Sequence, residues 1–303
     1  MEIRPVESDE DLQRWLDVRS ELVPDDRVGL EEAKYFRASL PEIYDVLAWE
    51  DGESVAAATV LLRATKAIPI PRIFVLPHAQ RRGIGTALFE HLSRWAAERG
   101  YDAFEIWIED THPEGKAFAT KRGYEEIGRE DRLVLELADA TVPDVPPPEG
   151  IEIVTWAERP ELARGLYEVA CECSRDIPGE EEYEMEPFED WVEHDLGGPG
   201  DRPEALFVAV AGDEVVGFSK LSLSDAQPET AHHDLTGVRR SWRNRGIAAA
   251  LKARQIRWAK GSGYERLVTR NEERNAPIRK LNDRFGYRPA PGRVLMRGPL
   301  FKA

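Results

Sequence analysis

Two stretches of the chain decide its fold: VLPHAQRRGIGT at residues 75–86 and VRRSWRNRGIAA at residues 238–249. Each follows an apolar run and precedes an amphipathic one, which predicts a strand, a short turn and the start of a helix. The stretches are 163 residues apart (238 minus 75). The same offset aligns Trp95 with Trp258, Tyr101 with Tyr264, and Gly123-Tyr124 with Gly286-Tyr287. A register held over roughly fifty residues without a gap indicates a tandem duplication.

The duplication predicts two domains, at residues 1–138 and 151–303, joined by a linker at 139–150. The linker contains TVPDVPPP (141–148), whose prolines exclude a helix and favour an extended spacer. Within each half the pattern predicts an N-terminal helix, a hairpin, a strand, a long helix, a strand, a short helix and a final strand. We therefore expect an α/β (α+β) fold, with a mixed, mostly antiparallel sheet flanked by helices in each domain. The first helix, the two hairpin strands, the long helix, the next strand and the final strand are expected at 9–20, 44–50, 55–63, 84–99, 104–109 and 132–137, and then at 160–174, 205–211, 215–223, 247–260, 266–271 and 294–297. The strand before the long helix runs to Val75 or Val238, and the short helix ends before Gly123 or Gly286.

Charge is distributed unevenly along the 303 residues, which carry 41 Lys+Arg and 57 Asp+Glu for a net charge of −16. Residues 151–238 hold 5 basic and 22 acidic side chains, whereas residues 239–297 hold 17 basic and 4 acidic ones. The overall acidity argues against a nucleic-acid partner, and the basic segment suggests that this part of the second half meets an anion.

Neither a secretory signal nor an apolar run long enough to span a membrane is seen, so the sequence predicts a cytoplasmic protein without a membrane partner. Cys171 and Cys173 are spaced poorly for a disulfide or a metal site, and no metal is expected.

The repeated turn suits a phosphate. The first N–H groups of a helix lack intrahelical acceptors, the helix dipole adds positive charge there, and Gly83 or Gly246 lets an anion approach the backbone. A dinucleotide fingerprint is not completed, because Leu88 and Leu251 occupy its last glycine position, and a P-loop lysine is absent. A single copy could be a solvated turn, but two copies in one register favour a diphosphate site.

With these residues the chain resembles the GNAT N-acetyltransferases, whose acetyl-CoA motif is Arg/Gln-x-x-Gly-x-Gly/Ala and whose domains close on Gly-Phe/Tyr. The resemblance covers essentially the whole chain twice, and the tandem arrangement is similar to that of mycothiol synthase and related actinobacterial enzymes. It implies acetyl-CoA as co-substrate, held in a gap between two splayed strands. The cofactor-binding residues that it implies are Phe74, Val75, Gln80, Arg81, Arg82, Gly83, Ile84, Gly85, Thr86, Gly237, Val238, Arg243, Asn244, Arg245, Gly246, Ile247, Ala248, Ala249 and Asn275.

The catalytic residues are less clearly marked. The tyrosine that often protonates the leaving thiolate in this family is replaced by Ala119 and Asn282. Counting back by twos from Val238 places Thr236, Asp234 and His232 on one strand face, and His232 matches a position that carries the base in some members. We therefore expect catalysis in the second half, with His232 and Asp234 as candidates; the first half offers only Glu105 and Glu109 nearby.

The leading hypothesis is an N-acetyltransferase that moves the acetyl group of acetyl-CoA directly to a small-molecule amine in a ternary complex. The acidic run at residues 180–186 is either a solvated loop or an attractant for a cationic amine. A non-catalytic acyl-CoA-binding or sensing protein is the main alternative. The acceptor and the oligomeric state are not predicted.

Overall fold

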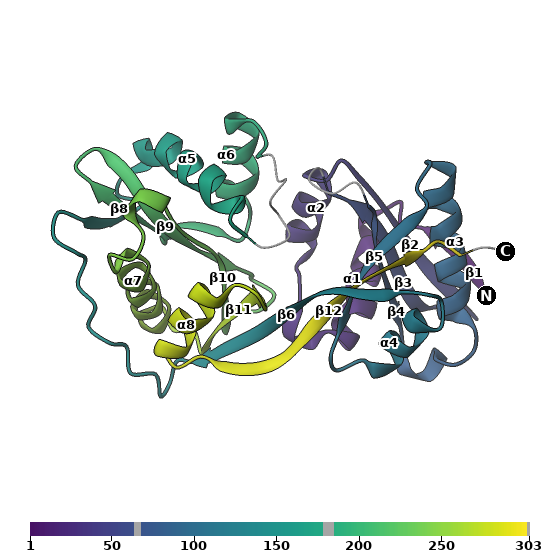
Figure 1. Ribbon diagram of the computed structural model, residues 1–303. Helices are drawn as coiled ribbons and strands as arrows, with labels where there is room; N and C mark the ends of the chain where they lie inside the picture. Colours follow the sequence, from purple (N-terminus) through teal and green to yellow (C-terminus); the bar gives the residue numbers. More distant parts are fainter. Residues whose placement is uncertain (64–67, 178–184, 302–303) are drawn as a thin grey trace. The chain divides into compact units, whose positions relative to one another are not determined.

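The computed structural model describes residues 1–63, 68–177 and 185–301. It forms two compact units that differ from the two sequence halves (Figure 1). Unit 1 consists of Met1–Arg129 and Pro291–Ala303, and unit 2 of Glu130–Ala290.

The units differ from the halves because the halves exchange their last strands. Strand β6 (Glu125–Glu136) belongs to the first half, yet Glu130–Glu136 pairs antiparallel with β11 (Arg266–Glu272) of the second. Strand β12 (Arg288–Pro299) belongs to the second half, yet Arg293–Pro299 pairs antiparallel with β5 (Ala103–Glu109) of the first. Each compact unit therefore contains a strand from the other copy. The segment 139–150 between the copies has no helix or strand.

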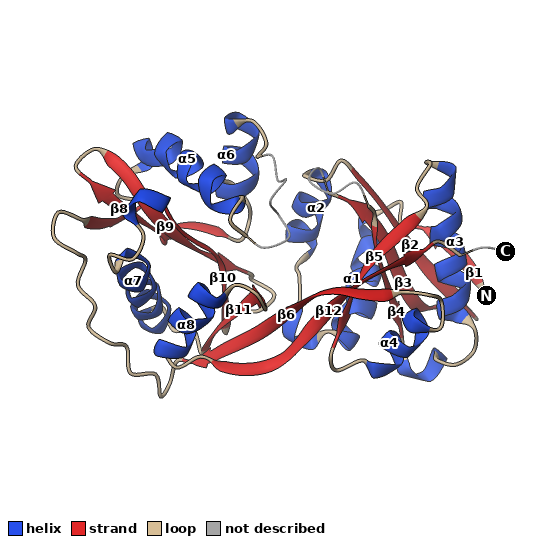
Figure 2. Ribbon diagram, viewed as in Figure 1, coloured by secondary structure: helices blue, strands red, loops and turns tan. Residues whose placement is uncertain are grey.

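Unit 1 is a helix-covered β structure (Figure 2). Its first sheet has the antiparallel order β1-β2-β3-β4 (Glu2–Pro5, Glu42–Glu50, Glu53–Leu62, Ile70–Val75). Apolar residues of α1 (Asp9–Leu22) and α2 (Leu30–Ala38) cluster with one face of this sheet, where Leu47 and Ala57 lie. Apolar residues of α3 (Ile84–Glu98) cluster with the other face, where Val46 and Ala56 lie. Helix α4 (Pro113–Thr120) follows β5.

Unit 2 repeats this order. Strands β7 (Glu152–Thr155), β8 (Asp201–Ala211), β9 (Glu214–Leu223) and β10 (Thr230–Val238) form an antiparallel series, to which β11 adds in parallel. Helices α5 (Ala163–Ser174) and α6 (Phe188–Leu196) cluster with one face, α7 (Ile247–Gly261) with the other, and α8 (Ala276–Arg284) follows β11. The expected fold class is confirmed; α2, α6, β1 and β7 are elements that the pattern did not predict.

The described part of the chain contains no helix that combines the length and apolar character needed to cross a bilayer. Both cysteines are free thiols, and Cys173 is buried.

Candidate active site

The candidate site lies where β4 and β5 of unit 1 part from each other. At their beginnings, the N–H of Glu105 donates to the carbonyl of Pro69 at 3.2 Å, after which the two strands belong to different sheets. A cavity of about 780 Å³ opens between them and reaches the turn before α3. Because β4 lies at the edge of its sheet, residues from both of its faces, Pro71 to Val75, line this cavity.

The turn before α3 has the geometry expected for a diphosphate cradle. Gly83 caps the helix with φ +87, and Arg81 also has a positive φ of 62. A Cβ at Gly83 would meet no atom within 4 Å, so the position is open, and the left-handed conformation favours glycine there. The side chain of Gln80 donates to the carbonyl of Val75 at 3.0 Å and ties the turn to the end of β4. The free N–H groups of the first turn of α3 then face an open approach for an anion.

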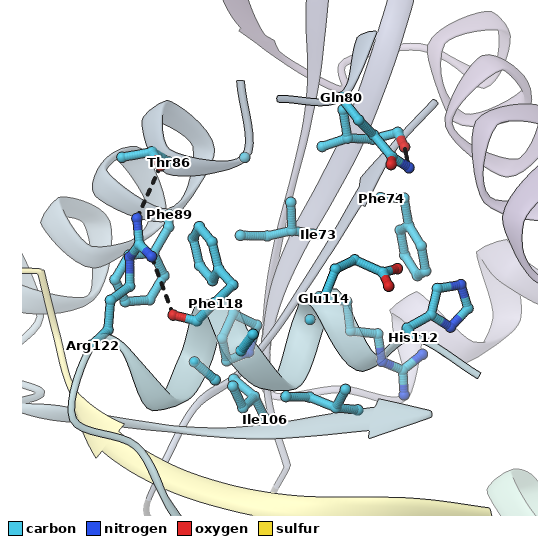
Figure 3. Close-up of a pocket in the computed structure, with 18 of the residues that line it drawn as sticks. Ile73, Phe74, Gln80, Thr86, Phe89, Ile106, His112, Glu114, Phe118 and Arg122 are labelled. Carbon is cyan, nitrogen blue, oxygen red and sulfur yellow. Dashed lines mark hydrogen bonds between the residues drawn. The ribbon is translucent and has the colours of Figure 1, made fainter. Parts of the chain in front are cut away.

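The α3 and α4 walls of the cavity are mostly apolar. Figure 3 shows Ile73 centrally, with Phe89 and Phe118 from the two helices beside it and Ile106 below. Arg122 donates to Thr86 Oγ1 at 2.9 Å and stacks on Phe118, with 3.4 Å from its Cζ to the ring centroid. A ligand with a long, largely apolar chain and a polar group at its end fits such a channel.

Tyr124 also lines the cavity, and its hydroxyl is buried without a hydrogen-bond partner among the described residues. Burial raises the pKa of this phenol, so it stays protonated at neutral pH. Ala119, at the position of the family's frequent tyrosine, also lines the cavity and adds no polar group. A phenol thus reaches the cavity from a different position.

Most of the predicted unit 1 residues line the cavity: Phe74, Val75, Gln80, Arg81, Gly83, Gly85 and Thr86. Two others do not. Arg82 pairs with Glu50 at 2.9 Å, and Ile84 is buried in the core beneath the turn.

In unit 2 the turn has the same backbone, with φ 62 at Asn244 and φ 91 at Gly246. Its arginines, however, are held by neighbours. Arg243 donates to the carbonyl of Val238 at 2.9 Å and pairs with Asp176 of the turn after α5, and Arg245 stacks on Trp242 at 4.7 Å. A Cβ on Gly237 would lie 2.8 Å from the sulfur of Cys173, so α5 packs tightly there. Among the other predicted residues, Ile247 and Ala249 are buried, Ala248 is half-buried, and Asn275 caps α8.

A β-bulge corrects the predicted alternation along β10. Between His233 and Thr236 the register against β9 gains one residue, so both of these side chains lie on the α7 face. There Thr236 contacts Ser219 Oγ at 2.7 Å, and the Nε2 of His233 contacts the hydroxyl of Tyr287. Counting by twos predicts that Thr236 and His232 share one face. This prediction is wrong, because the bulge places them on opposite faces.

His232 and Asp234 lie on the opposite face, with Lys220 of β9. The ammonium of Lys220 contacts Asp201 at 2.8 Å and Asp234 at 3.3 Å and donates to the backbone carbonyl of Asp195. Burial disfavours the charge of Lys220, but the surrounding carboxylates raise its pKa. The Asp234 carboxylate is thus already engaged by a lysine. Most of the acidic run at 180–186 lies outside the described residues.

The interior of unit 2 differs from that of unit 1 at matching positions. The 163-residue offset matches Lys252 with Phe89, Asn282 with Ala119, and Thr269 with Ile106. All three polar side chains of unit 2 are buried. Asn282 donates to Asn271 at 2.6 Å, while its Oδ1 has no hydrogen-bond partner among the described residues. The apolar channel of unit 1 is therefore replaced by polar groups at these positions.

Several cavity residues of unit 1 were not predicted. Arg72 lies on the β4 face opposite to Ile73, and Trp107 lies on β5. Glu114 and His112 flank the start of α4, near Phe74 (Figure 3). At the 163-residue offset, His112 is the counterpart of Asn275. A count along both faces of the two splayed strands would have found Arg72 and Trp107 beside Glu109, which was already noted.

A comparison with known protein families finds the same family in both copies of the repeat. The model of the acetyltransferase (GNAT) family matches residues 10–124 and again 163–287. The chain belongs to the GNAT acetyltransferase family. It is a tandem member, and proteins of this family use acetyl-CoA.

Two curated relatives are mycothiol acetyltransferases. The protein from Catenulispora acidiphila is 26% identical over 228 residues, covering 72% of this chain and 69% of its own length. The protein from Nocardia farcinica is 24% identical over 254 residues, covering 81% and 79%.

Solved structures share the fold over the whole chain. A tandem GNAT protein from the clavulanic acid biosynthesis pathway superposes with a TM-score of 0.81 at 19% identity, covering 100% of this chain and 99% of its own. A GCN5-related N-acetyltransferase from Sphaerobacter thermophilus superposes with a TM-score of 0.74 at 22% identity, covering 100% and 96%.

Proposed function

We propose that this acetyltransferase moves the acetyl group of acetyl-CoA directly to the amine of a small molecule, and that unit 1 is where acetyl-CoA binds. The observation that carries the proposal is the cavity between β4 and β5, which joins the anion-binding turn before α3 to an apolar channel. Bound acetyl-CoA would supply an activated acyl group. The turn Gln80–Thr86 would hold its diphosphate, and Phe89 and Phe118 would flank its pantetheine arm.

Direct transfer needs a neutral amine and a proton for the departing sulfur. We assign to Glu109, which lines the cavity from β5, the acceptance of the proton from the amine. We assign to Tyr124, whose phenol stays protonated, the delivery of a proton to the thiolate. General acid and base groups each contribute about 10²–10⁴-fold in rate. Catalysis in unit 2 through His232 and Asp234 stays a prediction, as does a cationic acceptor.

A matched pair of substitutions tests the location. Gly85→Asp adds a carboxylate in the first turn of α3. The helix dipole stabilises a negative charge there, but that charge would repel a bound diphosphate. A Cβ there would make only an ordinary contact, 3.7 Å from Val75. We expect at least a tenfold rise in the Kd for CoA by calorimetry, with an unchanged melting temperature. Ala248→Asp, the equivalent change in unit 2, is the control. An effect of Ala248→Asp alone would refute the assignment to unit 1.

The alternative, a non-catalytic acyl-CoA-binding protein, is favoured by the absence of the family tyrosine at Ala119 and Asn282. Thiol release from acetyl-CoA with a broad amine panel separates the two functions. Tight CoA binding without thiol release for any amine would establish the alternative. In an active protein, Glu109→Gln should lower kcat about 10²-fold or more while leaving the KM for acetyl-CoA within about threefold.

A further inference from the structure

Arg72 is an arginine in the cavity of unit 1 that pairs with no residue in the described part of the chain. It is half-buried and lines the cavity from the middle of β4. Its guanidinium has no hydrogen bond or ion pair with any of the residues that the structure describes. Arginine carries five donors in a fixed fork and stays charged, so leaving it unpaired in a partly dry site is costly.

The direction of this side chain follows from the strand alternation. Phe74 packs edge-on against Trp15 of α1, with ring centroids 5.8 Å apart, whereas Ile73 and Val75 belong to the α3 side of the core. Arg72 is two residues before Phe74 in an unbroken register with β3, so it lies on the α1 face. Leu22 and Val23, at the end of α1, line the cavity there.

The surroundings of Arg72 add positive charge. Burial lowers the pKa of Arg72 to about 10, and the charges of Arg19, Arg63 and Arg293 act in the same direction. Asp26 opposes them but is already bound to Arg19 at 2.7 Å. Arg293 comes from the exchanged strand β12 and stacks on Trp107, with 4.3 Å from its Cζ to the ring centroid. The α1 side of the cavity is therefore short of negative charge around Arg72.

An anion at this position would not come from the cofactor. The phosphates of CoA belong at the turn before α3, across the sheet from the α1 face. We propose that the molecule acetylated by this protein carries an acidic group, a carboxylate or a phosphate, and that Arg72 binds it. The inference rests on the proposed function of unit 1. Glu109 lines the same cavity from the strand opposite, which suits an acceptor that has both an amine and an anionic group.

The second copy supplies the matched variant, because Leu235 occupies the position equivalent to Arg72. Arg72→Leu removes the charge, and Arg72→Lys keeps the charge but loses the fork. Since Arg72 has no partner among the residues that the structure describes, Arg72→Leu should leave the melting temperature equal to or above that of the wild type. A merely structural arginine would lower it.

The first arm of the experiment measures acceptor preference. Thiol release is followed with glycine against glycinamide, and with glucosamine 6-phosphate against glucosamine. A charge-assisted hydrogen bond is strong enough that we expect at least a tenfold higher kcat/KM for one of the acidic acceptors. Arg72→Leu should reduce that preference 10- to 100-fold, and Arg72→Lys should reduce it less. The two pairs distinguish a carboxylate from a phosphate.

The second arm measures binding without turnover. Calorimetry of the CoA-loaded protein compares N-acetylglycine with N-acetylglycinamide, and N-acetylglucosamine 6-phosphate with N-acetylglucosamine. At least a tenfold tighter Kd for an acidic ligand, lost in Arg72→Leu, supports the inference even if no amine releases thiol, which would refute the proposed function alone. Equal affinities within each pair, no binding of any of the four ligands, or a preference that Arg72→Leu retains would overturn it.

Discussion

Lys252 allows a direct test of what a buried charge costs the stability of unit 2. It lies in α7 with 1% of its surface exposed, and its ammonium is 4.8 Å from the ring centroid of Tyr287. Burial lowers its pKa from 10.5 to about 7. A shift of about 3.5 units corresponds to about 5 kcal/mol, at 1.36 kcal/mol per unit. The cost of the buried charge is therefore about 5 kcal/mol.

The sign of the pH dependence follows from this depressed pKa. Between pH 7 and 10.5 the unfolded chain holds the Lys252 proton more tightly than the folded chain, so the penalty is full below pH 7 and fades as the pH rises. Lys252→Met has nearly the same shape and no charge. We expect it to raise the free energy of unfolding by about 5 kcal/mol at pH 6 and by less than about 1 kcal/mol at pH 10.

Urea unfolding at both pH values, followed by tryptophan fluorescence, measures this difference. Arg254→Met, an exposed cation on the same helix, is the control and should change stability by less than about 0.5 kcal/mol at either pH. A loss of stability in Lys252→Met, or an equal gain at pH 6 and pH 10, would refute the reasoning. Either result would mean that the ammonium has a favourable partner or ready access to water.

Three further predictions concern other features. Burial raises the pKa of Asp195 from 3.8 to about 6, so the folded state favours its protonated form. The stability that this form contributes is present below pH 3.8 and is lost as the pH rises through 6. Asp195→Asn should therefore add about 2 kcal/mol of stability at pH 7.5 and almost none at pH 3.5, measured by urea midpoints. Tyr124→Phe removes a buried hydroxyl without a partner and should gain about 1 kcal/mol in thermal unfolding, while kcat falls at least tenfold if the phenol protonates the thiolate; an unchanged kcat would exclude that role. Deleting residues 291–303 removes the strand that pairs with β5, and limited proteolysis should then cleave unit 1 well before unit 2; equal resistance would show that β6 alone completes unit 1.

Much of the fold could be predicted from the sequence because the repeat supplies every signal twice. Gly83 and Gly246 share a left-handed conformation, and their turns, strands and long helices lie where the pattern predicts them. The strand exchange could not be predicted in this way. Since the copies are alike, the last strand of either one has the same local pattern, and the choice of partner depends on long-range pairing alone.

The candidate site was predicted best where backbone conformation defines it and least well where side-chain direction does. The bulge between His233 and Thr236 has no sequence signature, yet it moves Thr236 to the other face of β10. Arg72 was missed for a related reason, since a strand at a splayed edge exposes both faces to the cavity and a count along one face finds half of the lining. The prediction of catalysis in the second half, which stays untested, also rests on a count along one face of its strand.

The exchanged strands also make each folded unit depend on both copies of the repeat. Codons 291–299 lie in the second copy of the duplicated gene, yet the strand that they encode completes the first unit beside β5. A substitution there changes the second copy in the sequence but acts on the unit that the first copy mainly forms. Loss or replacement of one copy would therefore also take a strand from the unit that the other copy mainly forms.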